Sequence, residues 1–245
     1  MKRRALAILV LAMLGGPLTA APAERCIVID AGHGGVRDVD ESSANNATST
    51  SGVLEKDLTL EVAHAVFDAI KSSDAAKKLG IVPVMTRERD ENIGMTERAR
   101  IALAHETRAF VSIHFNASPA HTARGPLGMV QSAEHGNPHV ARDGAFANLL
   151  AAAVSTVTRR ADAKSQHHDF LTDRELKGGR GSFLLRHLRA EPRGQMFPAC
   201  FLEIEFIDHP AVDAWLVRGD AARAIRRAIA QALAEALVDY VAKHD

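Results

Sequence analysis

The 245-residue sequence has little of what marks several classes of protein. It contains two cysteines, one tryptophan and one tyrosine, and its 30 basic and 30 acidic residues give no formal net charge. Two cysteines are too few for a disulfide-dense scaffold. The shortage of aromatic residues and the lack of a basic excess argue against a nucleic-acid partner. What is present is a 47% hydrophobic chain, enough for one large globular domain.

The first 23 residues are typical of a secretory signal peptide. Basic residues at positions 2–4 precede the apolar run 5–14, and small residues follow up to Ala23, where we expect processing. The run is short for a membrane span, although an uncleaved anchor remains an alternative. We therefore expect an exported protein, periplasmic in preference to extracellular. Its mature part, residues 24–245, would carry 27 basic and 30 acidic residues, a net charge of about −3, without a membrane attachment.

The two cysteines, Cys26 and Cys200, each begin an apolar run with the composition of a strand. An exported protein meets an oxidising environment, which permits a disulfide between neighbouring strands. Free cysteine is also a common small buried hydrophobe. Both interpretations stay open at the level of sequence.

Strand-like and helix-like segments alternate along the chain. Apolar runs predict strands at 26–29, 81–86, 109–114, 127–131 and 199–207, with a further short one at 182–188, and helical periodicity predicts helices at 57–80, 146–157 and 220–241. Thr96 is expected to cap another short helix, Ser73 to mark a break in the first, and Pro83 to place its strand at an edge. This alternation predicts an α/β fold with a twisted, mostly parallel central sheet, helices on both faces and ligands at the carboxyl ends of the strands.

Three polar residues lie where such ends are expected. His33 stands between glycines after the first strand, His114 ends the strand 109–114, and Glu55 precedes the first helix. Two imidazoles and one carboxylate form a catalytic zinc set that keeps a fourth position for water. Taken singly, each also has a structural interpretation, as a loop histidine, a core histidine and a helix-start carboxylate.

Glu203 is an acid inside the otherwise apolar strand 199–207. Burying a carboxylate costs several kcal/mol unless it is paired or ligated, so we expect either a functional role or an arginine partner. The functional role would be that of a general base, which takes a proton from the zinc-bound water and returns it to the departing amine.

At these residues the sequence resembles the zinc-dependent N-acetylmuramoyl-L-alanine amidases of the bacterial cell wall, the amidase-3 family. The matching segments, in order, are 29–35, 54–58, 85–87 with Asp90 and Glu97-Arg98, 112–117, and 202–210, and they extend over nearly the whole mature chain. The resemblance implies that His33, Glu55 and His114 bind Zn²⁺ and that Glu203 is the catalytic acid/base. Residues 24–245 would then form a single zinc amidase catalytic domain.

The sequence departs from the family pattern in Ala31, which replaces a proline, in a longer loop between His33 and Glu55, and in Glu205, where a glycine is common. On a strand Glu205 would share a face with Glu203, so we expect it to tune the pKa of Glu203 or to bind the stem peptide.

Further roles are expected for a few polar residues near the motifs. Asn116 would contact substrate or shape a loop, and Asp30 would hydrogen-bond a ligand histidine or simply end its strand. Arg87 and Arg98 are expected to be structural. Related enzymes can be held inactive by a helix inserted between the second histidine and the final glutamate, and the region 125–195 is long enough to contain one, around residues 161–181.

The resemblance implies peptidoglycan or its fragments as substrate and cleavage of the amide between N-acetylmuramic acid and L-alanine. The mature chain is short for a separate wall-binding module, so we expect localisation to come from the catalytic domain itself or from a recruiting or activating protein. We also expect a monomeric enzyme. Two alternatives stay open: a zinc peptidase or carboxypeptidase that cuts within stem peptides, and a non-enzymatic wall-binding protein on the same scaffold. The products of murein digestion distinguish them.

Overall fold

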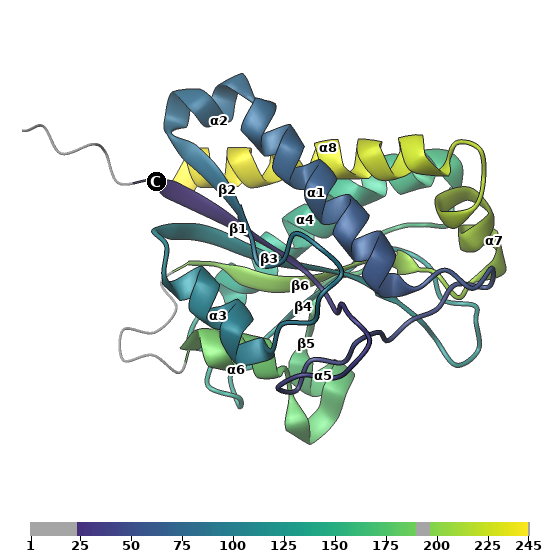
Figure 1. Cartoon of the computed structure of the whole chain (residues 1–245), viewed down its shortest axis with the longest axis horizontal. Helices are drawn as coiled ribbons and strands as arrows, with labels where there is room; N and C mark the ends of the chain where they lie inside the picture. Colours follow the sequence, from purple (N-terminus) through teal and green to yellow (C-terminus); the bar gives the residue numbers. More distant parts are fainter. Residues whose placement is uncertain (1–23, 190–196, 245) are drawn as a thin grey trace, which may run out of the picture.

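A six-stranded sheet runs through the centre of the computed structural model, which describes residues 24–189 and 197–244 (Figure 1). In sheet order the strands are β2 (Ile81–Met85), β1 (Arg25–Ala31), β3 (Thr107–Asn116), β6 (Ala199–Phe206), β4 (Leu127–Val130) and β5 (Leu171–Thr172). The first four are parallel, β4 runs antiparallel to β6, and β5 is parallel to β4. The predicted α/β fold with a mostly parallel sheet is confirmed.

Helices cover both faces of this sheet. They are α1 (Glu55–Ser72), α2 (Asp74–Leu79), α3 (Met95–Leu103), α4 (Val140–Ala161), α5 (Asp173–Lys177), the 3₁₀ turn η1 (Gly178–Arg180), α6 (Phe183–Arg189), α7 (Pro210–Val212), the π-helical turn η2 (Asp213–Val217) and α8 (Ala222–His244). The helices α1, α4 and α8 pack together on one face, and α3 and α6 cover the other (Figure 1). In the described part of the chain, no helix has the length and apolar character needed to cross a membrane.

The strands are apolar on both sides because each face meets helices. Along β1, Ile27 and Ile29 belong to the core cluster under α1, α4 and α8, whereas Val28 belongs to the smaller cluster under α3 and α6. All three side chains are fully buried. Hydrophobic burial on both faces therefore holds the carboxyl ends of β1, β3 and β6 in one rigid edge, where the candidate site lies.

Two predicted elements differ in the structure. The run 182–188 forms the helix α6 instead of a short strand, because Leu184, Leu185 and Leu188 recur at helical spacing and bury one face. The helix α3 begins at Met95, before Thr96, which therefore does not cap it. The amide of Thr96 instead donates to Asp40 Oδ2 at 2.9 Å, so a carboxylate from the long loop acts as the cap.

Other local predictions hold. The first long helix breaks at Ser73, whose side chain accepts a hydrogen bond from the amide of Ala76 and caps α2. Pro83 lies in the edge strand β2. The predicted signal peptide, residues 1–23, falls outside the described residues.

Cys26 and Cys200 are both buried free thiols. They lie on β1 and β6, and β3 runs between these strands: Val111 of β3 pairs with Ile29 on one side and with Cys200 on the other. Neighbouring strands are about 4.8 Å apart, so two strand spacings exceed the roughly 4.4–6.8 Å between Cα atoms that a disulfide needs. The disulfide alternative is ruled out.

Candidate metal centre

The backbone after β1 aims the His33 side chain at the sheet edge. His33 has a φ of 62°, a left-handed conformation that is uncommon for residues other than glycine. At Gly32 a Cβ atom would lie 2.3 Å from His114 Cε1, so only glycine lets the second imidazole approach. His33 Nδ1 lies 3.0 Å from the Ser43 carbonyl oxygen, to which it can donate. This contact leaves Nε2 directed toward Glu55.

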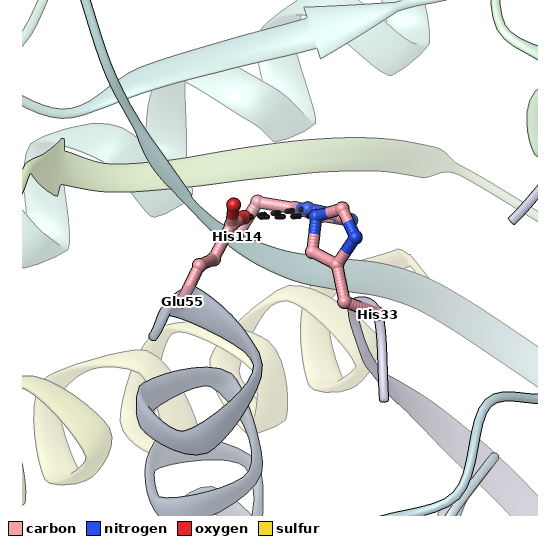
Figure 2. Close-up of side chains that lie close together, drawn as sticks. All are labelled: His33, Glu55 and His114. Atoms are coloured by element: carbon pink, nitrogen blue, oxygen red, sulfur yellow. Dashed lines mark hydrogen bonds and ion pairs between the residues drawn. The ribbon is translucent and has the colours of Figure 1, made fainter. Parts of the chain in front are cut away.

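Three side chains from separate elements meet at this edge, His33 after β1, Glu55 at the start of α1 and His114 on β3 (Figure 2). Glu55 Oε1 lies 3.0 Å from His114 Nδ1 and 3.2 Å from His33 Nε2. The amides of Phe115 and Ala47 donate to Oε1 and Oε2 at 3.0 and 2.8 Å. Two backbone amides therefore fix the carboxylate so that Oε1 faces both imidazoles.

The electrostatics of the cluster favour the protonation states of metal ligands. Burial acts to raise the pKa of Glu55, but hydrogen bonds and charge from His114 and His33 lower it well below its usual value. Burial also lowers the pKa of His114 to about 4, against the opposing effect of Glu55. At neutral pH the carboxylate is ionised and the His114 imidazole is neutral, and these are the forms that bind a metal ion.

The donor set fits a divalent ion such as zinc. One ligand atom from each of His33, Glu55 and His114 can be chosen so that all three lie within 4.8 Å of one another. In a tetrahedral zinc site with metal–ligand distances near 2.1 Å, ligand atoms lie roughly 3.4 Å apart, close to the oxygen–nitrogen distances seen here. His33 Nε2 is buried and lacks a hydrogen-bond partner of acceptable geometry. A buried polar atom in that state is rare unless something binds it.

Glu203 lies beside this cluster. It is in register with His114 across β3 and β6, and its Oε2 is buried without a hydrogen-bond partner. Burial and the charge of Glu55 raise the pKa of Glu203 to about 8, while Lys177 acts in the opposite direction. Within the described residues no arginine forms an ion pair with it, so the structural alternative finds no partner there. His33, His114 and Glu203 line one pocket of about 310 Å³.

Asp30 does not contact a ligand histidine directly. It is buried, and it accepts hydrogen bonds from Arg98 at 2.6 Å and from the hydroxyls of Thr86 and Ser112 at 2.5 Å. Ser112 Oγ also lies 3.0 Å from His114 Nε2. Because the hydroxyl proton goes to Asp30, Oγ can accept from Nε2–H, and in that tautomer His114 Nδ1 offers its lone pair to an ion in place of the hydrogen bond to Glu55. The expected link between Asp30 and His114 therefore runs through a serine.

Ser112 is the residue that our sequence reasoning missed. The available signal was its position two residues before His114, since alternate residues of a strand share a face. A hydroxyl on the ligand face of a buried strand is a candidate hydrogen-bond partner for the ligand.

Two buried arginines hold the turn that carries His33. Arg98 donates to the carbonyls of Ala31 and His33 at 2.7 and 2.8 Å. Arg87 donates to the carbonyls of Ala31 and Gly32, both at 2.9 Å. These contacts agree with the structural role expected for both arginines, and they explain how a strained turn keeps one conformation.

Glu205 is placed differently from our expectation. It is fully buried, its Oε2 accepts from the amides of Gly125 and Phe206 at 2.8 and 2.9 Å, and its Oε1 accepts from the Ser165 hydroxyl. It does not line the pocket that contains Glu203. These contacts argue against tuning of Glu203 and against stem-peptide binding, and they give Glu205 a structural role.

The reason for this difference is an irregularity in β6. Opposite His114 and Asn116 of β3 stand Glu203 and Phe206, so β6 has one extra residue at that point. Such a bulge interrupts the alternation of faces on which the prediction depended. Asn116 is affected as well: its Oδ1 accepts from the amide of Ala117 at 2.9 Å, and it does not line the pocket. The loop-shaping alternative describes this placement better than substrate contact.

Comparison with known proteins agrees with this geometry. A family model described as N-acetylmuramoyl-L-alanine amidase matches residues 27–235. The uncharacterized protein YqiI of Bacillus subtilis is 35% identical over 118 residues, which cover 45% of this chain and 50% of that protein. The N-acetylmuramoyl-L-alanine amidase LytC of the same species is 32% identical over 99 residues, 40% of this chain and 17% of LytC. The matched part thus spans half or less of these relatives.

The fold is also found among solved structures. The catalytic domain of the N-acetylmuramoyl-L-alanine amidase CwlV from Bacillus (Paenibacillus) polymyxa superimposes with a TM-score of 0.63 at 22% identity. The alignment covers 89% of this chain and 98% of that domain. Because the family match extends over most of the sequence, the chain belongs to the N-acetylmuramoyl-L-alanine amidase family.

Proposed function

We propose that this protein is a peptidoglycan hydrolase that cleaves the amide between N-acetylmuramic acid and the first L-alanine of the stem peptide. His33, Glu55 and His114 would hold one zinc ion, and Glu203 would be the general acid/base. The observation that carries the proposal concerns two buried atoms without a well-formed hydrogen bond, Glu203 Oε2 and His33 Nε2, of which the second lies 3.2 Å from Glu55 Oε1; both residues line one pocket. Family membership supplies the reaction class.

The residues divide the chemistry between them. A zinc ion bound here would lower the pKa of a coordinated water to about 7 and polarise the substrate carbonyl. Glu203 Oε2 accepts the proton of the attacking water and then donates it to the alanine nitrogen as the amide bond breaks. Burial raises the pKa of Glu203, which favours its protonated form, the form that donates to the leaving nitrogen. The Phe201 ring, stacked on His114 with centroids 4.6 Å apart, keeps water from that side of the imidazole.

The proposal includes the location of the enzyme and the extent of its catalytic domain. The basic and then apolar pattern of the first 23 residues supports export, to the periplasm in preference to the exterior. Residues 24–245 would then act there as one catalytic domain, with peptidoglycan or its fragments as substrate.

The test is digestion of purified murein followed by mass spectrometry of the products. An amidase releases intact stem peptides that begin with L-alanine, and a chelator should stop the release until zinc is restored. The Glu203→Gln variant should keep its zinc and lose about 10²–10⁴-fold in rate. Glu235→Gln, an exposed change on α8 whose partner is Gln231, is the matched control and should behave like the wild type.

Three results would contradict the proposal. Fragments cut within the stem peptide would indicate a peptidase. Zinc bound without any product would indicate a wall-binding protein, and active protein without metal would remove the proposed role of His33, Glu55 and His114.

A further inference from the structure

The wall of the site pocket carries two cations that form no ion pair with any described residue, although the acids Glu41 and Glu203 line the same pocket. The end of α5 and the residues after it contribute to the pocket that His33 and His114 line, and Lys177 and Arg180 are both among its lining residues. Within 24–189 and 197–244 neither forms an ion pair. Two other cations of this region are paired: Arg174 contacts Glu134 at 2.8 Å and Arg189 contacts Asp143 at 2.6 Å. Lys177 and Arg180 lack such a partner where they line the pocket.

An aromatic ring sets the position of the Lys177 ammonium. Nζ lies 5.3 Å from the centroid of the Phe201 ring, within the range of a cation–π contact. The same Phe201 ring stacks on His114 with an interplanar angle of 24°. The Lys177 ammonium and a candidate zinc ligand therefore contact one common ring. Among the described residues Nζ has no hydrogen-bond acceptor, so its donors are available to a ligand.

The chemistry of the substrate indicates what these cations would bind. Sugars on the glycan side of the scissile amide are uncharged, whereas the peptide side bears carboxylates. An extended peptide advances about 3.5 Å per residue, so a carboxyl on the residue after alanine lies roughly 7 Å from the scissile bond. The Phe201 centroid lies 4.6 Å from that of His114 and 5.3 Å from Lys177 Nζ, so the ammonium is at most about 10 Å from the His114 ring, within reach of such a carboxyl. Hydrogen bonds between ammonium or guanidinium and carboxylate are among the strong ones.

We propose that Lys177 and Arg180 form a carboxylate subsite for the residue that follows L-alanine in the stem peptide. The subsite would make the enzyme selective for stem peptides with a free carboxyl group at that residue over those in which it is amidated. This inference rests on the proposed function, because it takes the peptide side of the scissile amide to lie toward Lys177.

The experiment compares two synthetic substrates, muramoyl-L-alanyl-D-isoglutamic acid and the corresponding isoglutamine amide. We expect wild-type kcat/KM to favour the acid by about 10-fold or more, the size of one charge-assisted hydrogen bond. Lys177→Met and Lys177→Met/Arg180→Met should bring the ratio close to one, mainly through KM. The matched control is Lys71→Met, because Lys71 Nζ lies 5.5 Å over Phe67 on α1 in the same kind of contact, away from the pocket. That variant should keep the wild-type ratio.

The possible outcomes distinguish failure of the carboxylate subsite from failure of the proposed amidase function. A wild-type ratio near one would overturn the subsite, as would an equal loss on both substrates in Lys177→Met, which would mean that Lys177 acts through Glu203 or through the local fold. Binding of the two compounds to zinc-loaded Glu203→Gln, measured by calorimetry, gives the same comparison without turnover. A Lys177-dependent preference for the acid there, with no cleavage by the wild type, would support the subsite and refute the proposed function.

Discussion

Two regions of the molecule bury carboxylates in different ways. Around the His33 turn, Asp30 is paired with the Arg98 guanidinium at 2.6 Å. Near β4 and the end of α4, Glu205 is met by the Gly125 and Phe206 amides and the Ser165 hydroxyl, and no cation pairs with it among the described residues. Both side chains are essentially excluded from solvent. One region thus balances charge with charge, and the other uses neutral hydrogen-bond donors.

The two carboxyl groups respond in opposite directions. For Asp30, burial acts to raise the pKa, but the charge of Arg98 and hydrogen bonds from Ser112 and Thr86 lower it overall. For Glu205, burial dominates and raises the pKa despite hydrogen bonds from Ser165 and two amides. The comparison shows that a buried carboxylate stays reliably ionised where a guanidinium accompanies it. Asp30 is in that situation beside the candidate metal ligands, and its ionised carboxylate also orients His114 through the hydroxyl of Ser112.

The largest expected effect comes from removing the cation on the ligand side. Arg98→Met leaves Asp30 buried without a counter-charge and frees the carbonyls of Ala31 and His33, so we expect a loss of about 3–5 kcal/mol in the free energy of unfolding. Denaturant unfolding measures it. The control is Arg100→Met on the same helix, because Arg100 is exposed and pairs only with Glu97 at the surface; it should cost under about 1 kcal/mol. Similar small losses in both variants would show that the buried pair is not what holds the turn.

A smaller effect is expected at the serine that links the two networks. Ser112→Ala removes the acceptor of His114 Nε2 and one donor to Asp30, so zinc should bind about 10–100-fold more weakly. Competition with a chromophoric chelator measures the dissociation constant. Ser72→Ala, at an exposed serine that bonds only to carbonyls of α1, should leave it unchanged. Unaltered zinc affinity in Ser112→Ala would mean that Gly32 and Phe201 orient the imidazole without help.

The smallest expected effect is a change on the order of 1 kcal/mol in the free energy of unfolding as pH changes. Its direction should differ between Asp30 and Glu205. The folded pKa of Asp30 is lowered, so its contribution to stability is present above the unfolded value of about 3.9 and is lost as pH falls toward the folded value. The folded pKa of Glu205 is raised, so its contribution is present below about 4.3 and is lost as pH rises through the folded value.

Urea unfolding of the wild type, Asp30→Asn and Glu205→Gln at several pH values tests this contrast. The stability advantage of the wild type over Asp30→Asn should shrink toward acid pH, and its advantage over Glu205→Gln should shrink toward neutral pH. If the stability advantage of the wild type changed with pH in the same way for both variants, the two regions would not differ in how they hold a buried carboxyl group.

Much of the fold and the four central site residues could be predicted from local patterns. Apolar runs and helical spacing located the strands and the main helices, because burial on one or two faces leaves a periodic trace in the sequence. The four polar residues of the candidate site were noticeable because each lies at the end of an apolar strand run, inside one, or at the start of a helix. They are His33, Glu55, His114 and Glu203. Contacts between distant residues leave no such trace, so Ser112 as the link between Asp30 and His114 was not predicted.

Two misplacements have specific physical causes. Glu205 was assigned to the face of Glu203 by strict alternation, but the extra residue in β6 interrupts that alternation. The segment 182–188 was taken for a strand because a short apolar run fits either period, and only its packing under the sheet beside α3 shows that it is helical.

By itself, the sequence determined the order of elements, the identity of the chemical groups and the class of fold, because these follow from hydrophobic periodicity and from polar residues that break it. The tertiary structure alone decided which nitrogen of each histidine faces Glu55, which buried carboxylate gains a cation, and that Lys177 and Arg180 line the same pocket as His33 and His114. Those outcomes depend on distances between residues far apart in the chain, and such distances are set by how the sheet and its helices pack together.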